Sequence, residues 1–110
     1  MNFSQIKNIH FVGIGGIGMS GIAEILARAG HSVSGCDLKR SPATELLERR
    51  GIPVAIGHDP SHVEGQDVVV MTAAVKGVND ELEAARQRGV RIVRRSEALG
   101  ALVNAKRAVG

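Results

Sequence analysis

A dense group of glycines near the start of the chain is the feature most suited to chemistry. Residues 13–18 read Gly-Ile-Gly-Gly-Ile-Gly, a G-x-G-x-x-G pattern that follows a short apolar segment typical of a buried strand. In such a turn the first glycine permits the tight bend, the second lets the backbone approach a ligand, and the third lets a helix pack close to the strand. The N–H groups at the start of that helix then face an anion. The pattern therefore predicts a site for the diphosphate of a nucleotide or dinucleotide.

An acidic residue at a suitable distance supports this interpretation. Asp37 ends a second apolar segment and follows Gly18 by 19 residues, where an acidic side chain typically meets a ribose hydroxyl. The alternative is a glycine turn that only packs a helix tightly, and it does not account for the additional Gly16. The residues leave open which nucleotide binds.

Strand-like and helix-like segments alternate along the whole chain. Short apolar runs predict five strands, at residues 9–12, 32–36, 53–56, 67–71 and 90–93. Three helices are expected to begin after the glycines, at Ser41-Pro42 and at Asn79, and to stop near Gly30, Gly51 and Gly89. A single helical turn is expected after Asp59-Pro60, and a last helix near Ser96-Glu97.

This alternation predicts an α/β fold of the Rossmann-like, three-layer kind. Strands separated by helices form a parallel sheet with helices on both faces, and crossovers are right-handed. With a glycine-rich first turn, the expected sheet has about five strands in the order 3-2-1-4-5.

Composition excludes several classes of protein. The chain has 110 residues, a net charge of +3, no Trp or Tyr and two Phe, so it lacks the stacking platforms that nucleic-acid-binding modules use. No apolar run approaches the roughly 20 residues of a membrane span, and the first residues do not resemble a signal peptide, so a cytoplasmic location is expected. The single cysteine, Cys36, excludes an internal disulfide, and no histidine has metal-ligand spacing with a cysteine or carboxylate, so no metal is predicted.

Residues 9–24, Ile-His-Phe-Val-Gly-Ile-Gly-Gly-Ile-Gly-Met-Ser-Gly-Ile-Ala-Glu, closely resemble the first domain of the Mur ligases, ATP-dependent enzymes of peptidoglycan synthesis. Met19-Ser20 lies outside the dinucleotide fingerprint, so the run is more specific than the glycines alone. The resemblance covers essentially the whole chain, continuing through residues 33–38, 57–59, 67–70, 72–75 and 93–95.

The resemblance implies a site for UDP-N-acetylmuramate. The diphosphate would be held at Gly13 and by the backbone of Gly15, Gly16, Ile17, Gly18, Met19 and Ser20, with the Ser20 hydroxyl as a further donor. Asp37 and Leu38 would lie beside the uridine and His58 near the uracil. Thr72, Ala73, Ala74 and Val75 would face the diphosphate or the amino sugar.

The resemblance also implies the reaction of the full-length enzyme. There, ATP and Mg²⁺ activate the muramoyl carboxylate as an acyl phosphate, which the amine of L-alanine attacks to form an amide. The domain itself would hold no cofactor and no catalytic residue, and would contribute by positioning the substrate.

Two departures from the family pattern shape these expectations. Serine is expected at position 36, where this chain has Cys36, and the phosphate-binding loop G-x-x-x-x-G-K-[ST] does not occur. Residues 1–105 are therefore interpreted as an excised UDP-N-acetylmuramate-binding domain, and 106–110 as the start of the connection to an ATP-binding domain. The chain alone is expected to be inactive.

Three alternatives stay open. An NAD-binding Rossmann module fits the glycine fingerprint, and an interaction domain with a vestigial nucleotide site fits less well, because the glycines and Asp37 are intact. Within the family, the ligase that attaches murein peptides to the same UDP-sugar is a close sibling of the L-alanine-adding member. Arg94 and Arg95 are either solvated or reach an anionic substrate or a neighbouring domain.

Overall fold

The core of the fold is a parallel sheet of five strands in the order β3-β2-β1-β4-β5. The computed structural model describes residues 6–16, 18–57, 60–71, 79–98 and 100. Every neighbouring pair in the sheet is parallel, and the register places Phe11 beside Gly35 and Val70. The strands are β1 (Asn8–Val12), β2 (Ser32–Asp37), β3 (Val54–Ile56), β4 (Val68–Met71) and β5 (Arg91–Arg94).

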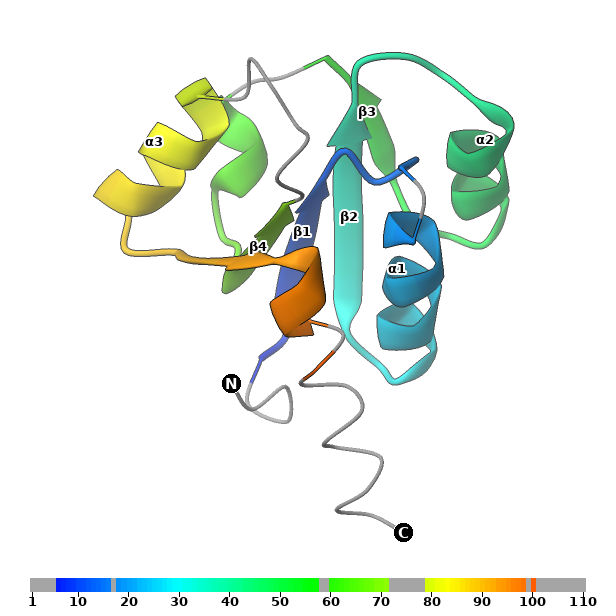
Figure 1. Ribbon diagram of the computed structural model, residues 1–110, viewed down its shortest axis with the longest axis horizontal. Helices are drawn as coiled ribbons and strands as arrows, with labels where there is room; N and C mark the ends of the chain where they lie inside the picture. The colour runs from blue at the N-terminus through cyan, green and yellow to red at the C-terminus, as the bar shows by residue number, and fades with distance from the viewer. Residues whose placement is uncertain (1–5, 17, 58–59, 72–78, 99, 101–110) are drawn as a thin grey trace, which may run out of the picture.

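Helices connect the strands in the predicted alternating order (Figure 1). They are α1 (Met19–Arg28), α2 (Pro42–Arg49), α3 (Asn79–Gln87) and the short 3-10 helix η2 (Pro60–Val63), and residues 95–98 are helical after β5. Ser41 caps α2 through a reciprocal pair of hydrogen bonds with Thr44, and Pro42 occupies the first helical position.

The sequence predictions of fold class and strand order are confirmed. Each predicted strand is present with ends shifted by at most one residue, and the expected turn after Asp59-Pro60 is η2. Gly30, Gly51 and Gly89, predicted to stop three helices, all have positive φ, a conformation that side chains other than glycine rarely adopt. The last helix begins at Arg95, one residue before the predicted position.

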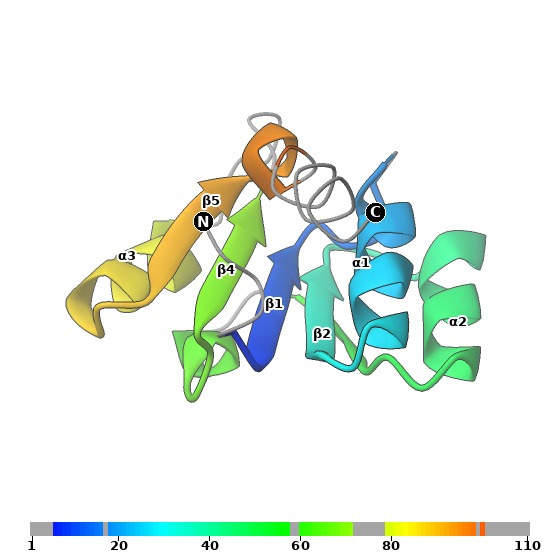
Figure 2. The same cartoon turned by 90° about the horizontal axis from the view of Figure 1, so that it is seen from below.

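Apolar side chains of the sheet form two cores, one on each face. The first core joins strand residues such as Ile9 and Phe11 to Leu26 of α1, Leu47 of α2 and Ala98. Figure 2 shows the helical turn after β5 on the same side of the sheet as α1. The second core is smaller and lies against η2 and α3, with the buried members Val12, Cys36, Val63, Val69 and Ala85. The fold is therefore three-layered, and β1 is covered on both faces.

Asp67 ties the starts of β1 and β4 together. Its Oδ2 accepts hydrogen bonds from the backbone N–H groups of Lys7 (3.0 Å) and Asn8 (2.9 Å), and its own N–H donates to the Asn8 carbonyl (2.9 Å). The bonds from Asn8 and Lys7 to the carboxylate hold the pKa of Asp67 below its ordinary value.

A lowered carboxyl pKa makes stability depend on acidity. The stabilisation is fully present above the ordinary aspartate pKa of about 3.9 and is lost as pH falls through the lower pKa of the folded state. We expect Asp67→Asn to lower the free energy of unfolding at pH 6 and to remove part of its fall between pH 4 and pH 2. Urea unfolding of both proteins across this range measures the effect, and identical pH dependence would contradict it.

Within the part of the chain that the structure describes, no helix has both the length and the apolar character needed to cross a bilayer.

Candidate functional site

The glycine turn bends sharply at the carboxyl end of β1. Gly13 has φ of 77°, in the left-handed region that favours glycine. The N–H groups of Gly13 and Ile14 both donate to the carbonyl of Cys36, at 2.8 and 3.1 Å. The turn is therefore fastened to the end of β2, as expected for the first glycine of the motif.

Asp37 holds the second glycine of the motif. Its Oδ2 accepts from the N–H of Gly15 at 2.9 Å, and its Oδ1 accepts from the N–H of Leu38 at 2.7 Å. A Cβ on Gly15 would lie 2.8 Å from that Oδ2 and 3.0 Å from Cγ2 of Thr44. In this structure the close neighbours of Gly15 are thus Asp37 and the start of α2. Positioning the turn is a structural task for Asp37, and its contact with a ribose stays a prediction.

Internal hydrogen bonds narrow the set of backbone donors that an anion can use. The N–H of Gly16 donates to the Gly13 carbonyl (3.0 Å), and that of Met19 donates to the Gly16 carbonyl (3.1 Å). The side chain of Met19 is fully buried in the first core, so it is not open to a ligand at the turn. Helix geometry leaves Ser20 and Gly21 without intrahelical acceptors, and no side chain caps α1. The backbone N–H groups in the first turn of α1 are therefore the donors that an anion can use.

Arg95 supplies a positive charge at this point. A Cβ built on Gly18 would lie 3.0 Å from Nη1 of Arg95 and 3.4 Å from its Cδ. Gly18 also has φ of 82° and is the N-cap of α1. The expected reason for the third glycine was close helix–strand packing, whereas here glycine allows the left-handed turn and leaves room for Arg95.

The charges around the N-terminus of α1 favour an anion. A cation near a helix N-terminus is unfavourable by itself, because the helix dipole is positive there. The first turn of α1 contains no acidic residue. The exposed guanidinium of Arg95 and the unpaired N–H groups of the helix can instead both donate to one diphosphate.

Exposed apolar side chains lie beside this site, at the ends of β2 and β3. Leu38 is 62% exposed and Ile56 is 45% exposed, and Ile56 is paired in register with Asp37. Each is an exposed aliphatic side chain close to Asp37, of the kind that can contact one face of a nucleobase. Leu38 was predicted on the uridine side, which stays a prediction; Ile56 was not among the predicted residues, although it ends a strand at its carboxyl end.

Several predicted site residues lie outside the described part of the chain. These are Ile17, His58, Thr72, Ala73, Ala74 and Val75. The structure brings together the others: the glycines at 13, 15, 16 and 18, Met19, Ser20, Asp37 and Leu38 all border the carboxyl end of the sheet between β1 and β2. Parallel sheets of this kind bind ligands at that edge.

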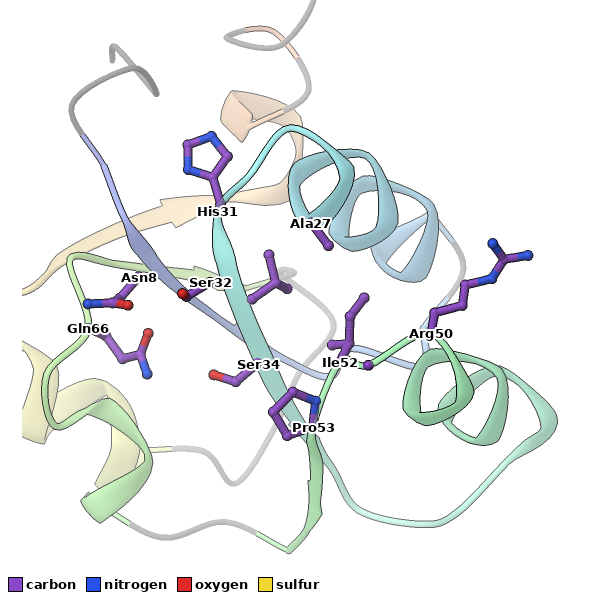
Figure 3. A pocket seen from close by; sticks show the side chains of 11 residues that line it. Asn8, Ala27, His31, Ser32, Ser34, Arg50, Ile52, Pro53 and Gln66 are labelled. Carbon is purple, nitrogen blue, oxygen red and sulfur yellow. The ribbon is translucent and has the colours of Figure 1, made fainter.

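A large cavity lies at the other end of the sheet, where the amino ends of the strands meet. It has a volume of about 480 Å³ and surrounds the amino end of β2, where β3 does not pair with residues 32–34. Figure 3 shows Asn8, Ser34 and Gln66 on one side of β2 and Ala27 and Ile52 on the other. The cavity is remote from the glycine turn and is not part of the candidate site.

Arg95 is the most important residue whose role the sequence left open. The choice between a solvated arginine and one that reaches an anion depends on where the chain turns after β5. Helix formation directly at Arg95 brings its side chain back over the N-terminus of α1. The sequence signal for Arg95 was a basic residue at the carboxyl end of a strand. Arg94 has the same signal, so the sequence could not choose between the two.

Similar proteins point to one enzyme family. Residues 8–107 match the family described as Mur ligase family, catalytic domain. A UDP-N-acetylmuramate–L-alanine ligase of Jannaschia sp. (strain CCS1) is 55% identical over 100 residues, which cover 91% of this chain and 21% of that protein. The chain spans about a fifth of the length of the curated relatives it matches.

Solved structures agree with these relatives. UDP-N-acetylmuramate–alanine ligase of Thermotoga maritima superposes with a TM-score of 0.84 and 35% identity, over 92% of this chain and 23% of that one. The UDP-N-acetylmuramate:L-alanyl-gamma-D-glutamyl-meso-diaminopimelate ligase of Neisseria meningitides gives 0.72 and 38% identity, over 82% of this chain and 29% of that one. Since the family match covers most of its residues, the chain belongs to the Mur ligase family.

Proposed function

We propose that this chain is the UDP-N-acetylmuramate-binding domain of a UDP-N-acetylmuramate–L-alanine ligase. The observation that carries the proposal is the guanidinium of Arg95 over the uncapped N-terminus of α1, at a glycine turn fastened by Asp37. This arrangement suits a diphosphate. The identity of the nucleotide sugar is inferred from the names of the relatives. The L-alanine-adding ligase is favoured over the murein-peptide ligase because this chain is 55% identical to a relative of the first kind and 38% identical to one of the second.

Each part of the ligand has a proposed place at the carboxyl edge of the sheet. The diphosphate contacts the N–H groups at the start of α1, the Ser20 hydroxyl and Arg95. The ribose lies beside Asp37, and the uracil lies on Leu38 and Ile56, with His58 nearby. The amino sugar points toward Thr72–Val75.

The contribution of this domain to the ligase reaction is positioning. Holding the sugar nucleotide fixes the muramoyl carboxylate relative to ATP and L-alanine. Binding free energy then offsets part of the entropy that the reactants lose on reaching the transition state. ATP and Mg²⁺ would supply the activation of that carboxylate in the full-length enzyme. This chain has no lysine-bearing phosphate loop to hold the β- and γ-phosphates of ATP, so no step of the activation is assigned to its residues.

Ligand preference tests the proposal. We expect UDP and UDP-N-acetylmuramate to bind the chain with measurably higher affinity than NAD or NADH, because a dinucleotide needs a second crevice half built from further strands. Calorimetric titrations of one protein batch with all four ligands measure this. Tighter binding of NADH than of both uridine nucleotides, or equal affinity for all four, would overturn the assignment.

A further inference from the structure

Three potential metal ligands meet between the sheet and η2, although they are far apart in the sequence. Among the described residues, His10, Cys36 and His62 each place one ligand atom within 4.8 Å of the others. They come from β1, β2 and η2 respectively. The sequence predicted no metal because no pair has ligand spacing along the chain, and spacing does not reveal a cluster built from three elements.

The register of the sheet explains the cluster. His10 pairs with Ser34 and Val12 pairs with Cys36, so His10 and Cys36 project from the same face of adjacent strands. That face carries the second core, and Val63 of η2 packs in it directly after His62. His10 is 3% exposed, Cys36 is fully buried, and His62 is half-buried.

The orientation of His10 suits coordination. Its Nδ1 lies 3.1 Å from Oγ of Ser34, so this hydroxyl can fix the tautomer and leave Nε2 as the ligand atom. The Nε2 atom is buried, and the ring centroids of His10 and His62 are 5.6 Å apart. A second partner that orients a ligating imidazole is a usual feature of metal sites.

We propose that His10, Cys36 and His62 bind one borderline-soft transition-metal ion of the zinc class. One thiolate and two imidazoles suit zinc or cobalt, whereas magnesium and calcium require oxygen ligands, and none of the three residues supplies one. Tetrahedral bonds of about 2.0–2.3 Å place ligand atoms roughly 3.5 Å apart. The cluster must contract by about 1 Å, which the half-buried His62 on its four-residue 3-10 helix can provide.

Binding converts the Cys36 thiol to a thiolate. The sulfur–metal bond forms as the S–H bond breaks, the proton passes to solvent, and both histidines bind as neutral imidazoles. Three protein ligands leave a fourth position, which a water molecule would fill. The Cys36 carbonyl accepts the bonds from Gly13 and Ile14, so the ion would hold the strand end that fastens the glycine turn.

Cobalt titration tests the site directly. We expect the reduced, chelator-treated 110-residue chain to develop a thiolate-to-cobalt charge-transfer band that saturates at one equivalent of Co²⁺ and disappears on adding Zn²⁺. Cys36→Ser keeps a small side chain and should abolish the band. His62→Ala should weaken Co²⁺ binding at least tenfold.

A matched control and a second measurement complete the test. His31→Ala removes a half-buried histidine whose Nδ1 lies 2.7 Å from the Ile6 carbonyl, outside the cluster, and should leave the titration unchanged. One equivalent of Zn²⁺ should also raise the melting temperature of the wild-type chain but not that of His62→Ala. Absence of the band in the wild-type chain, or an equal band in Cys36→Ser, would overturn the proposal.

Discussion

Replacing Arg95 with methionine is expected to weaken the binding of UDP by about ten- to a hundredfold. Hydrogen bonds to charged groups contribute about 1.5–3 kcal/mol, and 1.4 kcal/mol corresponds to a factor of ten in affinity. Methionine retains much of the aliphatic length of arginine and removes the guanidinium that lies over Gly18. The free energy of unfolding should change little, because Arg95 is exposed.

Arg91→Met is the matched control for this substitution. Arg91 is also exposed, but it begins β5, whereas Arg95 follows the last residue of that strand, so Arg91 lies at the end of the sheet opposite the glycine turn. Both variants lose one positive charge, so a loss caused by net charge alone would affect them equally. Calorimetry with UDP measures both affinities, and equal losses in the two variants would contradict a direct role for Arg95.

The second large effect is expected from adding a single methyl group in the middle of β2. A Cβ on Gly35 would lie 2.6 Å from Cβ of Ile14 and 2.9 Å from its Cγ1. Ile14 is fully buried and Gly35 lies beside Phe11 in the sheet, so the turn and the strand must separate to admit the methyl group. We expect Gly35→Ala to lower the free energy of unfolding by about 1–3 kcal/mol, the usual cost of overpacking a core.

Gly21→Ala makes the same chemical change where there is space. A Cβ at Gly21 would meet nothing within 4 Å, and the residue lies in α1. Alanine in a helix is favoured over glycine by about 0.5–1 kcal/mol, so this variant should gain stability. Urea unfolding measures both, and a stable Gly35→Ala protein would show that the contact between Ile14 and β2 is looser than the structure indicates.

The fold was predictable because each element carries its own local signal. Continuous apolar runs such as Val68–Val70 indicate strands that are covered on both faces. Three helices end at glycines with positive φ, as predicted from the positions of those glycines in the sequence. Ser41-Pro42 predicted the start of α2 because capping depends on neighbouring residues only. Such short-range features, together with right-handed crossovers, leave few possible strand orders.

The candidate site was only partly predictable because its contacts are long-range. The motif located the glycine turn and Asp37, but it did not show that Asp37 holds the N–H of Gly15. Arg95 over Gly18, and the meeting of His10 with Cys36 and His62, depend on how distant segments pack. Neither contact can be predicted from local composition or from the spacing of residues along the chain.

The central claim is that the first turn of α1 and Arg95 bind the diphosphate of a uridine nucleotide. Mapping amide chemical shifts of the isotope-labelled chain during titration with UDP tests it most directly. We predict that the largest changes fall on Gly18, Ser20, Gly21 and Leu38 and on the side-chain Nε–H of Arg95. Changes concentrated instead around the cavity at Asn8, Ser34 and Gln66, on the opposite edge of the sheet, would contradict it.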